Sequence, residues 1–351
     1  MWNQFRNPEL IGKITAKLQK SRTPMHIMEV CGTHTMAIGK WGIRRLLPDT
    51  ISLISGPGCP VCVTPVSFID ELMKLKGVTI CTFGDLLRVP GTKGTLEKAR
   101  ASGLVVKIVY SPMEALKLAK RKDVVLAGIG FETTVPGIAL TIKKAAETGN
   151  KNFSVLPAFK TIPQALKTLL NAHDVHLNGF LLPGHVSVVI GRQAYDFLPR
   201  DYQVGGVVTG FEPVDILTAI HSLCMMAEQG KPEVLNSYKR VVSNKGNIAA
   251  QKIMNEVLEP SDAVWRGLGE IPDSGLSIRK EYSQYDALVK YGLEITDCEE
   301  KQGCRCGDVL QGKITPPKCP LFNTVCTPAN PIGPCMVSSE GSCAAYYKYE
   351  Q

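Results

Sequence analysis

Twelve cysteines stand out in this chain of 351 residues, and two of them form the motif Cys59-Pro60-Val61-Cys62. The apolar run 51–54 predicts a buried strand just before this motif, and the intervening Gly56-Pro57-Gly58 predicts a tight turn. A Cys-x-x-Cys motif at the end of a strand is typical either of a redox dithiol or of half of a soft-metal site. The motif alone does not decide between the two.

A third cysteine, Cys31, follows another predicted strand in the segment Glu29-Val30-Cys31-Gly32-Thr33-His34-Thr35. If a helix begins near Thr33, its N-terminal dipole should lower the pKa of the Cys31 thiol, and His34 could pair with the thiolate or supply a proton. A buried structural cysteine is the alternative. If its strand neighbours that of Cys59 and Cys62, three thiols converge at one sheet edge, where they suit either zinc with His34 or a low-spin iron.

Six more cysteines lie in a proline-rich tail with little hydrophobic periodicity: Cys304, Cys306, Cys319, Cys326, Cys335 and Cys343. Structural zinc sites are usually built from two close cysteine pairs, whereas this tail has one close pair and otherwise wide gaps. Wide spacing favours an iron–sulfur cluster, with zinc and a purely structural role as alternatives. Because this irregular tail can bury little apolar surface, we expect a metal centre or covalent cross-links to stabilise it.

Two more candidate residues follow predicted strands. Glu132 lies in Gly130-Phe131-Glu132-Thr133-Thr134, which is a poor match to a dinucleotide fingerprint because Thr133 stands where the third glycine would be. His185 lies in Pro183-Gly184-His185, where it could serve a site or be an ordinary loop residue. The segment Gly210-Phe211-Glu212-Pro213 repeats the first pattern, either through internal similarity or because two turns have the same requirement.

The composition, with 44% hydrophobic and 21% charged residues, predicts a globular protein with an ample core. The sequence contains no run of about 18 apolar residues, so no membrane-spanning helix is expected. Residues 1–6 lack the apolar core of a signal peptide, so we expect a cytoplasmic location, where twelve cysteines favour metal or thiol chemistry over disulfides. The net charge of +8 is scattered, which argues against a nucleic-acid partner and is equally compatible with an acidic protein partner.

Strands and helices alternate over the first 230 residues. Eight apolar runs predict strands at 25–30, 51–54, 78–82, 104–110, 124–129, 153–159, 179–182 and 205–209. Helices are expected at 8–20, 67–76, 95–102, 136–148, 162–172, 188–197 and 241–258. Strands that are apolar throughout predict parallel sheets covered on both faces. We therefore expect two similar Rossmann-like α/β units, 1–120 and 121–235, and a C-terminal domain, 236–351, that is irregular around 265–275 and in its tail.

These motifs together resemble the HypD family of hydrogenase maturation factors. The resemblance covers essentially the whole chain and includes the tail spacing Cys304-x14-Cys319-x6-Cys326-x16-Cys343. It implies a scaffold that works with a small HypC-type chaperone and holds the iron on which the Fe(CN)2CO unit of [NiFe]-hydrogenase is built. Cyanide would come from HypE, and the finished unit would pass to the hydrogenase large subunit.

The resemblance also implies roles for the residues. Cys31 is the candidate iron ligand, and Cys59 and Cys62 are either further ligands or a dithiol supplied with electrons by a [4Fe–4S] cluster. The cluster ligands would be Cys304, Cys319, Cys326 and Cys343. The remaining candidate catalytic residues, from the matching motifs, are His34, Glu132 and His185.

This match takes four of the six tail cysteines, so we expect Cys306 and Cys335 to lie near the cluster, where a disulfide could join them. The cysteines outside the motifs would be core or incidental residues: Cys81, Cys224 and Cys298. Two other functions stay open. One is a thiol–disulfide reductase in which the cluster reduces the Cys59–Cys62 pair, and the other is a zinc-stapled protein-interaction module.

Overall fold

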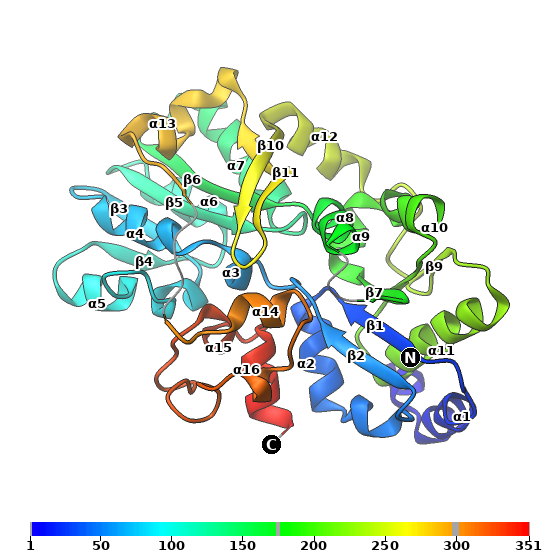
Figure 1. The fold of residues 1–351 in the computed structure, drawn as a ribbon. Coiled ribbons are helices and arrows are strands. Elements are labelled where there is room, and N and C mark those ends of the chain that lie inside the picture. The colour runs from blue at the N-terminus through cyan, green and yellow to red at the C-terminus, as the bar shows by residue number, and fades with distance from the viewer. Residues whose placement is uncertain (1, 173–175, 297–301, 351) are drawn as a thin grey trace.

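The computed structural model describes residues 2–172, 176–296 and 302–350, so Cys298 lies outside the described residues. It contains two sheets side by side, and a C-terminal segment rests against both of them (Figure 1). The first sheet is parallel, in the order β2 (Ile51–Ser55), β1 (Met25–Glu29), β7 (Gly179–Pro183), β8 (Gly205–Thr209) and β9 (Val234–Asn236). The second has the order β10 (Leu258–Trp265), β11 (Gly269–Ile278), β6 (Phe153–Lys160), β5 (Val124–Gly130), β3 (Thr79–Thr82) and β4 (Val106–Ile108).

All eight predicted strands are present, and the predicted α/β class with two parallel-dominated sheets is confirmed. Every residue of β5, β7 and β8 is buried, which agrees with sheets covered on both faces. The first-half helices are α1 (Pro8–Leu18), α2 (Gly32–Lys40), α3 (Pro60–Val63), α4 (Val66–Lys74), α5 (Leu96–Ala101), α6 (Pro112–Leu118), α7 (Val135–Glu147) and α8 (Ile162–Asn171). The later ones are α9 (Gly184–Ile190), α10 (Phe197–Tyr202), α11 (Pro213–Gln229), α12 (Ile248–Val257), α13 (Ala287–Tyr291), α14 (Cys306–Leu310), α15 (Pro334–Val337) and α16 (Ser342–Tyr349).

The two sheets do not correspond to the expected units 1–120 and 121–235, because each sheet contains strands from both parts of the chain. The chain forms β1 and β2 in the first sheet, crosses to the second for β3 to β6, returns for β7 to β9, and crosses again for β10 and β11. The first crossing passes through α3, which begins at Pro60. The Cys59–Cys62 motif therefore lies where the chain leaves one sheet for the other.

Two local predictions are wrong. The segment around 265–275 is not irregular, because β10 and β11 form an antiparallel hairpin that extends the second sheet through β6. The expected helix 188–197 is instead split by Gly191, whose φ of 81° ends α9 and is followed by a single 3-10 turn, Arg192–Tyr195. Glycine adopts this left-handed conformation at little cost, so it ends the helix there.

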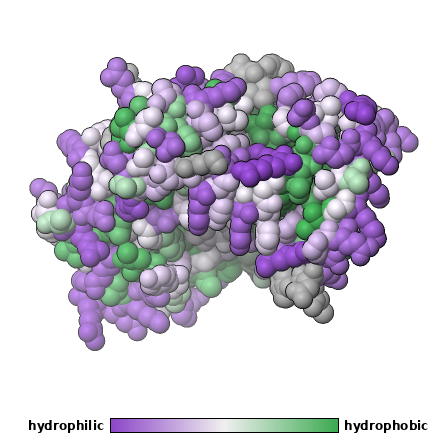
Figure 2. Space-filling view, turned by 90° about the horizontal axis from the view of Figure 1, so that it is seen from below, coloured by the Kyte–Doolittle hydropathy of each residue, from purple (hydrophilic) through white to green (hydrophobic). Residues whose placement is uncertain are grey.

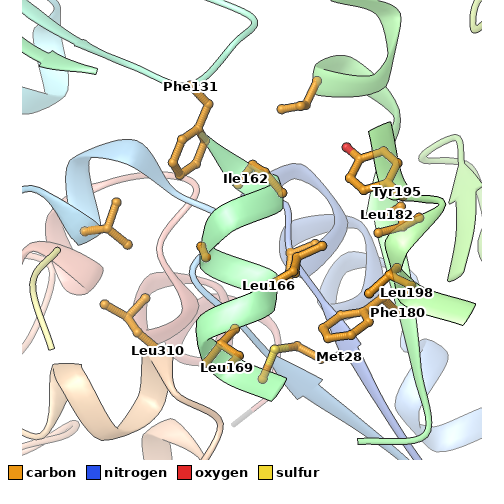
Figure 3. Packing of buried hydrophobic residues seen from close by; sticks show 14 of the residues in the cluster. Met28, Phe131, Ile162, Leu166, Leu169, Phe180, Leu182, Tyr195, Leu198 and Leu310 are labelled. Atoms are coloured by element: carbon orange, nitrogen blue, oxygen red, sulfur yellow. The ribbon is translucent and has the colours of Figure 1, made fainter. Parts of the chain in front are cut away.

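One hydrophobic core joins the two sheets and the C-terminal segment. Helix α8, which carries the chain back from the second sheet to the first, turns Ile162, Leu166 and Leu169 into this core (Figure 3). The core also contains Phe180 of β7 and Leu310 of α14. Its members include four cysteines: Cys59, Cys62, Cys306 and Cys335. These thiols are thus held by the packing that joins the parts of the molecule.

The surface is mostly hydrophilic on the face shown in Figure 2, with hydrophobic residues confined to smaller areas. Several exposed apolar side chains flank the edge strand β4, among them Val105, Ile108 and Tyr110. Within the described residues, no helix combines the length and the apolar character that crossing a membrane requires.

A buried charge network fixes α16 to the first sheet. Arg44 lies 3.5 Å from the Oε1 atom of the fully buried Glu29, forms an ion pair with Glu350, and packs 4.7 Å from the ring centre of Tyr346. Glu29 also accepts a hydrogen bond of 2.6 Å from Ser55. Burial raises the pKa of the Glu29 carboxyl, whereas Arg44 and Ser55 act in the opposite direction. Arg44 is therefore the charge that makes an ionised Glu29 tolerable there.

Replacing Arg44 with Met should lower the free energy of unfolding by about 3 kcal/mol at neutral pH, because it leaves Glu29 buried without a compensating charge. Arg200→Met is the matched control, since Arg200 pairs with Asp201 at the surface and its loss should cost less than about 1 kcal/mol. Urea unfolding of both variants measures the difference. Equal losses would show that the Arg44 network contributes no more than a surface ion pair.

Candidate thiol and metal site

The Cys31 and Cys59 loops meet at the carboxyl edge of the first sheet. Strands β1 and β2 are direct neighbours, as the convergence of the thiols required, and Cys31 and Cys59 stand at the N-caps of α2 and α3. The Gly32 amide donates a 3.0 Å hydrogen bond to the Gly58 carbonyl. A Cβ atom on Gly58 would lie 2.3 Å from the Cys31 nitrogen, so only glycine permits this approach.

Cys31 does not have the lowered pKa expected from the helix that follows it. The helix does begin at Gly32, and the backbone amides of Thr33 and His34 favour the thiolate. Burial outweighs them, and the negative charge of Glu340 adds to it, so that the pKa of Cys31 rises to about 11. The protein without metal therefore carries a thiol at this position.

His34 is not paired with Cys31. Its Nε2 atom donates a 2.9 Å hydrogen bond to the Gly210 carbonyl, and its ring packs 4.7 Å from that of Phe211. Nδ1, which then carries the lone pair, is buried and has no hydrogen-bond partner within the described part of the chain. Burial lowers the pKa of His34 to about 4, so the ring is neutral near neutral pH.

His185 lies in the first turn of α9 rather than in a loop. Its ring packs 4.2 Å from Phe211, so Phe211 contacts both imidazoles. Burial lowers the pKa of His185, and the charge of Glu340 opposes this. Glu340 was not predicted from the sequence. It precedes α16, accepts a 2.8 Å hydrogen bond from Thr33, and brings a carboxylate from the C-terminal segment toward Cys31 and His185.

Glu132 lies at the carboxyl end of β5, in the second sheet. It is 2% exposed, and its Oε1 atom accepts a 3.0 Å hydrogen bond from the Ile162 amide, whereas Oε2 has no partner in the described chain. Burial raises its pKa to about 7. Tyr195, also missed from the sequence, is fully buried, and its pKa is raised by burial and then by the charges of Glu132 and Cys31. Tyr195 thus lies within electrostatic range of Glu132 in the second sheet and of Cys31 in the first.

Glu132→Gln should change how stability depends on pH. The folded pKa of about 7 lies above the value of 4.5 for a solvated glutamate. Ionisation of the buried carboxyl therefore does not lower the free energy of unfolding below pH 4.5, and it lowers it by the full amount above pH 7. Wild type should therefore lose about 3 kcal/mol relative to the Gln variant as the pH rises from 4.5 to 8. Urea unfolding at both pH values tests this.

Glu212 of the repeated Gly-Phe-Glu pattern supplies the control, because its side chain pairs with Arg6, which lowers its pKa. The difference between wild type and Glu212→Gln should have the opposite sign, since the Glu212–Arg6 pair stabilises the fold once the carboxyl is ionised. Parallel pH profiles for wild type and Glu132→Gln would contradict the assignment of a buried titrating carboxyl.

Cys59 and Cys62 form a buried thiol pair. Their Sγ atoms are 2.7 Å apart, and the Cys62 amide lies 3.3 Å from the Cys59 sulfur. The two loops meet through their backbones, but no three of the described His, Cys, Asp and Glu side chains are arranged to hold a single metal ion. The dithiol alternative thus has direct geometric support.

A second buried pair, Cys306 and Cys335, adjoins the first. Their Sγ atoms are 2.6 Å apart, which confirms that these tail cysteines lie together; both are free thiols, so a disulfide between them remains a prediction. The Cys335 and Cys62 side chains lie close enough to shift each other's pKa, and the Cys304 side chain likewise shifts the pKa of Cys306. The two pairs and Cys304 therefore make a continuous row of thiols.

One apolar cavity is lined by Leu321, Phe322, Met336 and six cysteines. These are the four proposed cluster ligands, Cys304, Cys319, Cys326 and Cys343, and the pair Cys306 and Cys335. Burial raises the pKa of Cys343, and the negative charges of the other three raise it further, which shows how closely they are gathered. The Ile332 amide donates to the Cys326 sulfur, and a Cβ atom on Gly333 would lie 2.8 Å from the Cys304 sulfur. A closely walled apolar chamber that gathers these four cysteines, with the Cys306–Cys335 pair in its wall, fits an iron–sulfur cluster.

The fold and the site together define a two-sheet α/β protein in which all the described cysteines except Cys81 and Cys224 lie along one path between the sheets and the tail. The family model described as HypD, hydrogenase formation hypA family, matches residues 7–350. Hydrogenase maturation factor HypD of Rhodobacter capsulatus is 43% identical over 99% of this chain and 97% of its own length. The Escherichia coli protein of the same name is 42% identical over 99% and 98%, respectively.

An archaeal relative, a putative hydrogenase expression/formation protein of Methanocaldococcus jannaschii, is 41% identical over 97% of this chain and 95% of its own. The chain therefore belongs to the HypD family of hydrogenase maturation factors.

Proposed function

We propose that the protein is the scaffold on which the Fe(CN)2CO unit of [NiFe]-hydrogenase is assembled, together with a HypC-type chaperone. The observation that carries this proposal is the row of thiols from Cys304 through the two pairs to Cys59, whose loop contacts that of Cys31. A row of this kind suits a site that must receive both iron and electrons. The work would take place in the cytoplasm, where free thiols persist.

Iron is the cargo in this proposal, and Cys31 is its protein ligand. Its thiolate would supply the electron density that cyanide and carbon monoxide require of low-spin iron. His34 and His185 are neutral and offer nitrogen lone pairs or hydrogen bonds without added charge. Glu132, with its pKa of about 7, is suited to exchange protons near neutral pH.

The resident cofactor would be a [4Fe–4S] cluster held by Cys304, Cys319, Cys326 and Cys343. When bound, such a cluster supplies single electrons, two of which reduce a neighbouring disulfide to two thiols. The support for it is the apolar cavity that these side chains line and the contact between Cys304 and Cys306. HypE would bring the cyano group, and the finished unit would leave for the hydrogenase large subunit.

The electrons balance if Cys59 and Cys62 serve as the donor. Cleaving the S–CN bond of a thiocyanate group leaves a thiolate on the donor protein and a cyanide anion for iron, which consumes two electrons. Cys59 and Cys62 give up two electrons and two protons when they close to a disulfide. Cys335 and Cys306 can then reopen that disulfide by exchange and become oxidised in turn.

Infrared spectroscopy of the chain co-expressed with its partners tests the proposal. Cyanide and carbonyl stretching bands should co-purify with it, and about four further irons should give a brown protein when air is excluded. Absence of these bands from a complex that contains both partners would refute the scaffold role. A colourless protein that contains zinc would instead support the zinc-stapled module.

A further inference from the structure

The turn that joins β10 to β11 contacts the segment that directly follows the first thiol pair. The Arg266 amide donates a 2.8 Å hydrogen bond to the Val63 carbonyl, and its Nε atom donates a 3.0 Å bond to the Thr64 carbonyl. Val63 and Thr64 are the residues that directly follow Cys62. The backbone that carries Cys62 is therefore anchored to this turn rather than to its own sheet.

The same turn contacts the helix of the second pair. A Cβ atom on Gly267 would lie 2.3 Å from the Cα atom of Gly307, the residue next to Cys306, so the two backbones touch. Gln311 of the same helix donates a hydrogen bond to the Gly267 carbonyl. The turn is thus held between α3, which carries Cys62, and α14, which begins at Cys306.

The base of the turn is tightly packed around Trp265, and the turn buries the charged guanidinium of Arg266. Trp265 is fully buried, donates a 2.8 Å hydrogen bond from Nε1 to Ser274, and stacks on Phe131 with 5.9 Å between ring centres. The Arg266 side chain is 5% exposed, and its Nη2 atom has no hydrogen-bond partner among the described residues. Burying a guanidinium in this way is costly, so its role in holding α3 must offset a real penalty.

We infer that the β10–β11 turn is a spacer between α3 and α14 with Arg266, Gly267 and Gly307 as positioning residues. The turn places Cys306 and, through the 2.6 Å contact between the Cys306 and Cys335 sulfurs, sets the approach of Cys335 to Cys62. The inference rests on the thiol exchange in the proposed function. In that exchange the Cys335 thiolate attacks the Cys62 sulfur, the bond to Cys59 breaks, and Cys59 leaves as a thiolate. Cys306 then attacks Cys335 and releases Cys62, so two electrons move and a Cys306–Cys335 disulfide replaces the Cys59–Cys62 disulfide.

Exchange of this kind depends on where the attacking sulfur lies relative to the disulfide. A misplacement of about 1 Å can slow a positioned reaction by up to about 100-fold. Gly267→Ala would create the 2.3 Å contact with Gly307 and so push α14 from α3 by about 1 Å before the atoms reach ordinary separation. Gly307→Ala enters the contact from the other side, at 2.9 Å from the Gly267 Cα atom.

The chain offers a matched control at Gly269. Gly267 and Gly269 have φ angles of 78° and 75°, so alanine is equally strained at both. A Cβ atom on Gly269 would meet nothing within 4 Å. Gly307 has no positive φ and lies in α14, where alanine favours the helix, so Gly307→Ala should fold even if Gly267→Ala does not.

The experiment uses the full chain with its metal, in a Cys59→Ser/Cys306→Ser background that leaves one sulfur of each pair. Diamide, a two-electron oxidant, should join Cys62 to Cys335, and acid quenching with peptide mass spectrometry measures the rate. We expect at least a tenfold slower rate in Gly267→Ala and in Gly307→Ala, and a rate within twofold of the background in Gly269→Ala. Melting temperature and visible absorbance identify variants that fold.

The outcomes separate this inference from the function on which it rests. If the Cys62–Cys335 bond forms in the background and forms equally fast in Gly267→Ala and Gly307→Ala, the spacer role is overturned while the exchange survives. If Gly269→Ala slows the bond as much as they do, backbone strain explains the result and the spacer role is again overturned. If the bond does not form even in the background, the exchange itself fails.

Discussion

Cys31→Ala is expected to remove the cyanide and carbonyl infrared bands from the complex of this chain with its partners, to below about a tenth of the wild-type intensity. The thiolate of Cys31 is the proposed electron donor to iron, and alanine offers no ligand in its place. Neither His34 nor Glu340 supplies a sulfur donor, and the Cys59 sulfur is engaged with Cys62. The measurement is the band intensity per purified chain.

The control is Cys81→Ala, which removes an equally buried cysteine from β3, away from the site. Its bands should be unchanged. This comparison also separates the scaffold from a thiol–disulfide reductase, since a reductase needs the two pairs and the cluster but not Cys31. Undiminished bands in Cys31→Ala would show that a ligand other than Cys31 holds the iron. A loss of the bands in both variants would indicate a general effect on folding.

The sequence was most informative where a pattern is local. The eight predicted strands, β1 to β8, followed from apolar runs, and strands buried on both faces such as β5, β7 and β8 must be apolar throughout. The short strand β9 was not predicted. The meeting of Cys31 with the Cys59 turn also followed, because both cysteines end strands that lie side by side in a parallel sheet. The proximity of Cys306 and Cys335 was expected only because the family resemblance assigned the other four tail cysteines to a cluster.

What could not be predicted depends on distant contacts. Which sheet a strand joins is decided by crossings such as α3 and α8, and nothing in an apolar run specifies its neighbour. The glycines at 267 and 269 indicate a turn, but the flanking strands of the β10–β11 hairpin were missed. They contain Pro260 and Pro272, and their apolar and polar residues alternate only weakly.

Electrostatics at the site escaped sequence reasoning for the same reason. A helix after Cys31 was considered as a condition for a lowered pKa of Cys31. The sign of the pKa change instead depends on burial and on Glu340, which is about 300 residues further along the chain. Tyr195 looks like an ordinary aromatic residue until the fold brings it near Glu132. The only hint of Glu340 was an acidic residue three positions before a tail cysteine, which is a weak signal.

The double variant Cys59→Ser/Cys62→Ser should slow cyanide transfer to iron by at least about 100-fold while the visible absorbance of the cluster remains. The two hydroxyls cannot close to a disulfide, so no two-electron donor remains beside the Cys31 loop. Cys306 and Cys335 cannot replace them, because Cys335 adjoins Cys62 and the Cys31 loop is contacted by the loop of Cys59. Release of labelled cyano groups from the donor protein gives the rate, and Cys81→Ser/Cys224→Ser is the matched control.

The single variants Cys59→Ser and Cys62→Ser should differ in cyanide transfer. Their difference tests whether electrons pass from Cys335 to Cys62 and then to Cys59. Cys59→Ser leaves Cys62 in contact with Cys335, so these two sulfurs can still form a bond and supply two electrons once. Cys62→Ser removes the one sulfur that contacts both neighbours, so it should be as damaging as the double variant. If both single variants kept repeated turnover, electrons would have to reach the site without passing along the thiols.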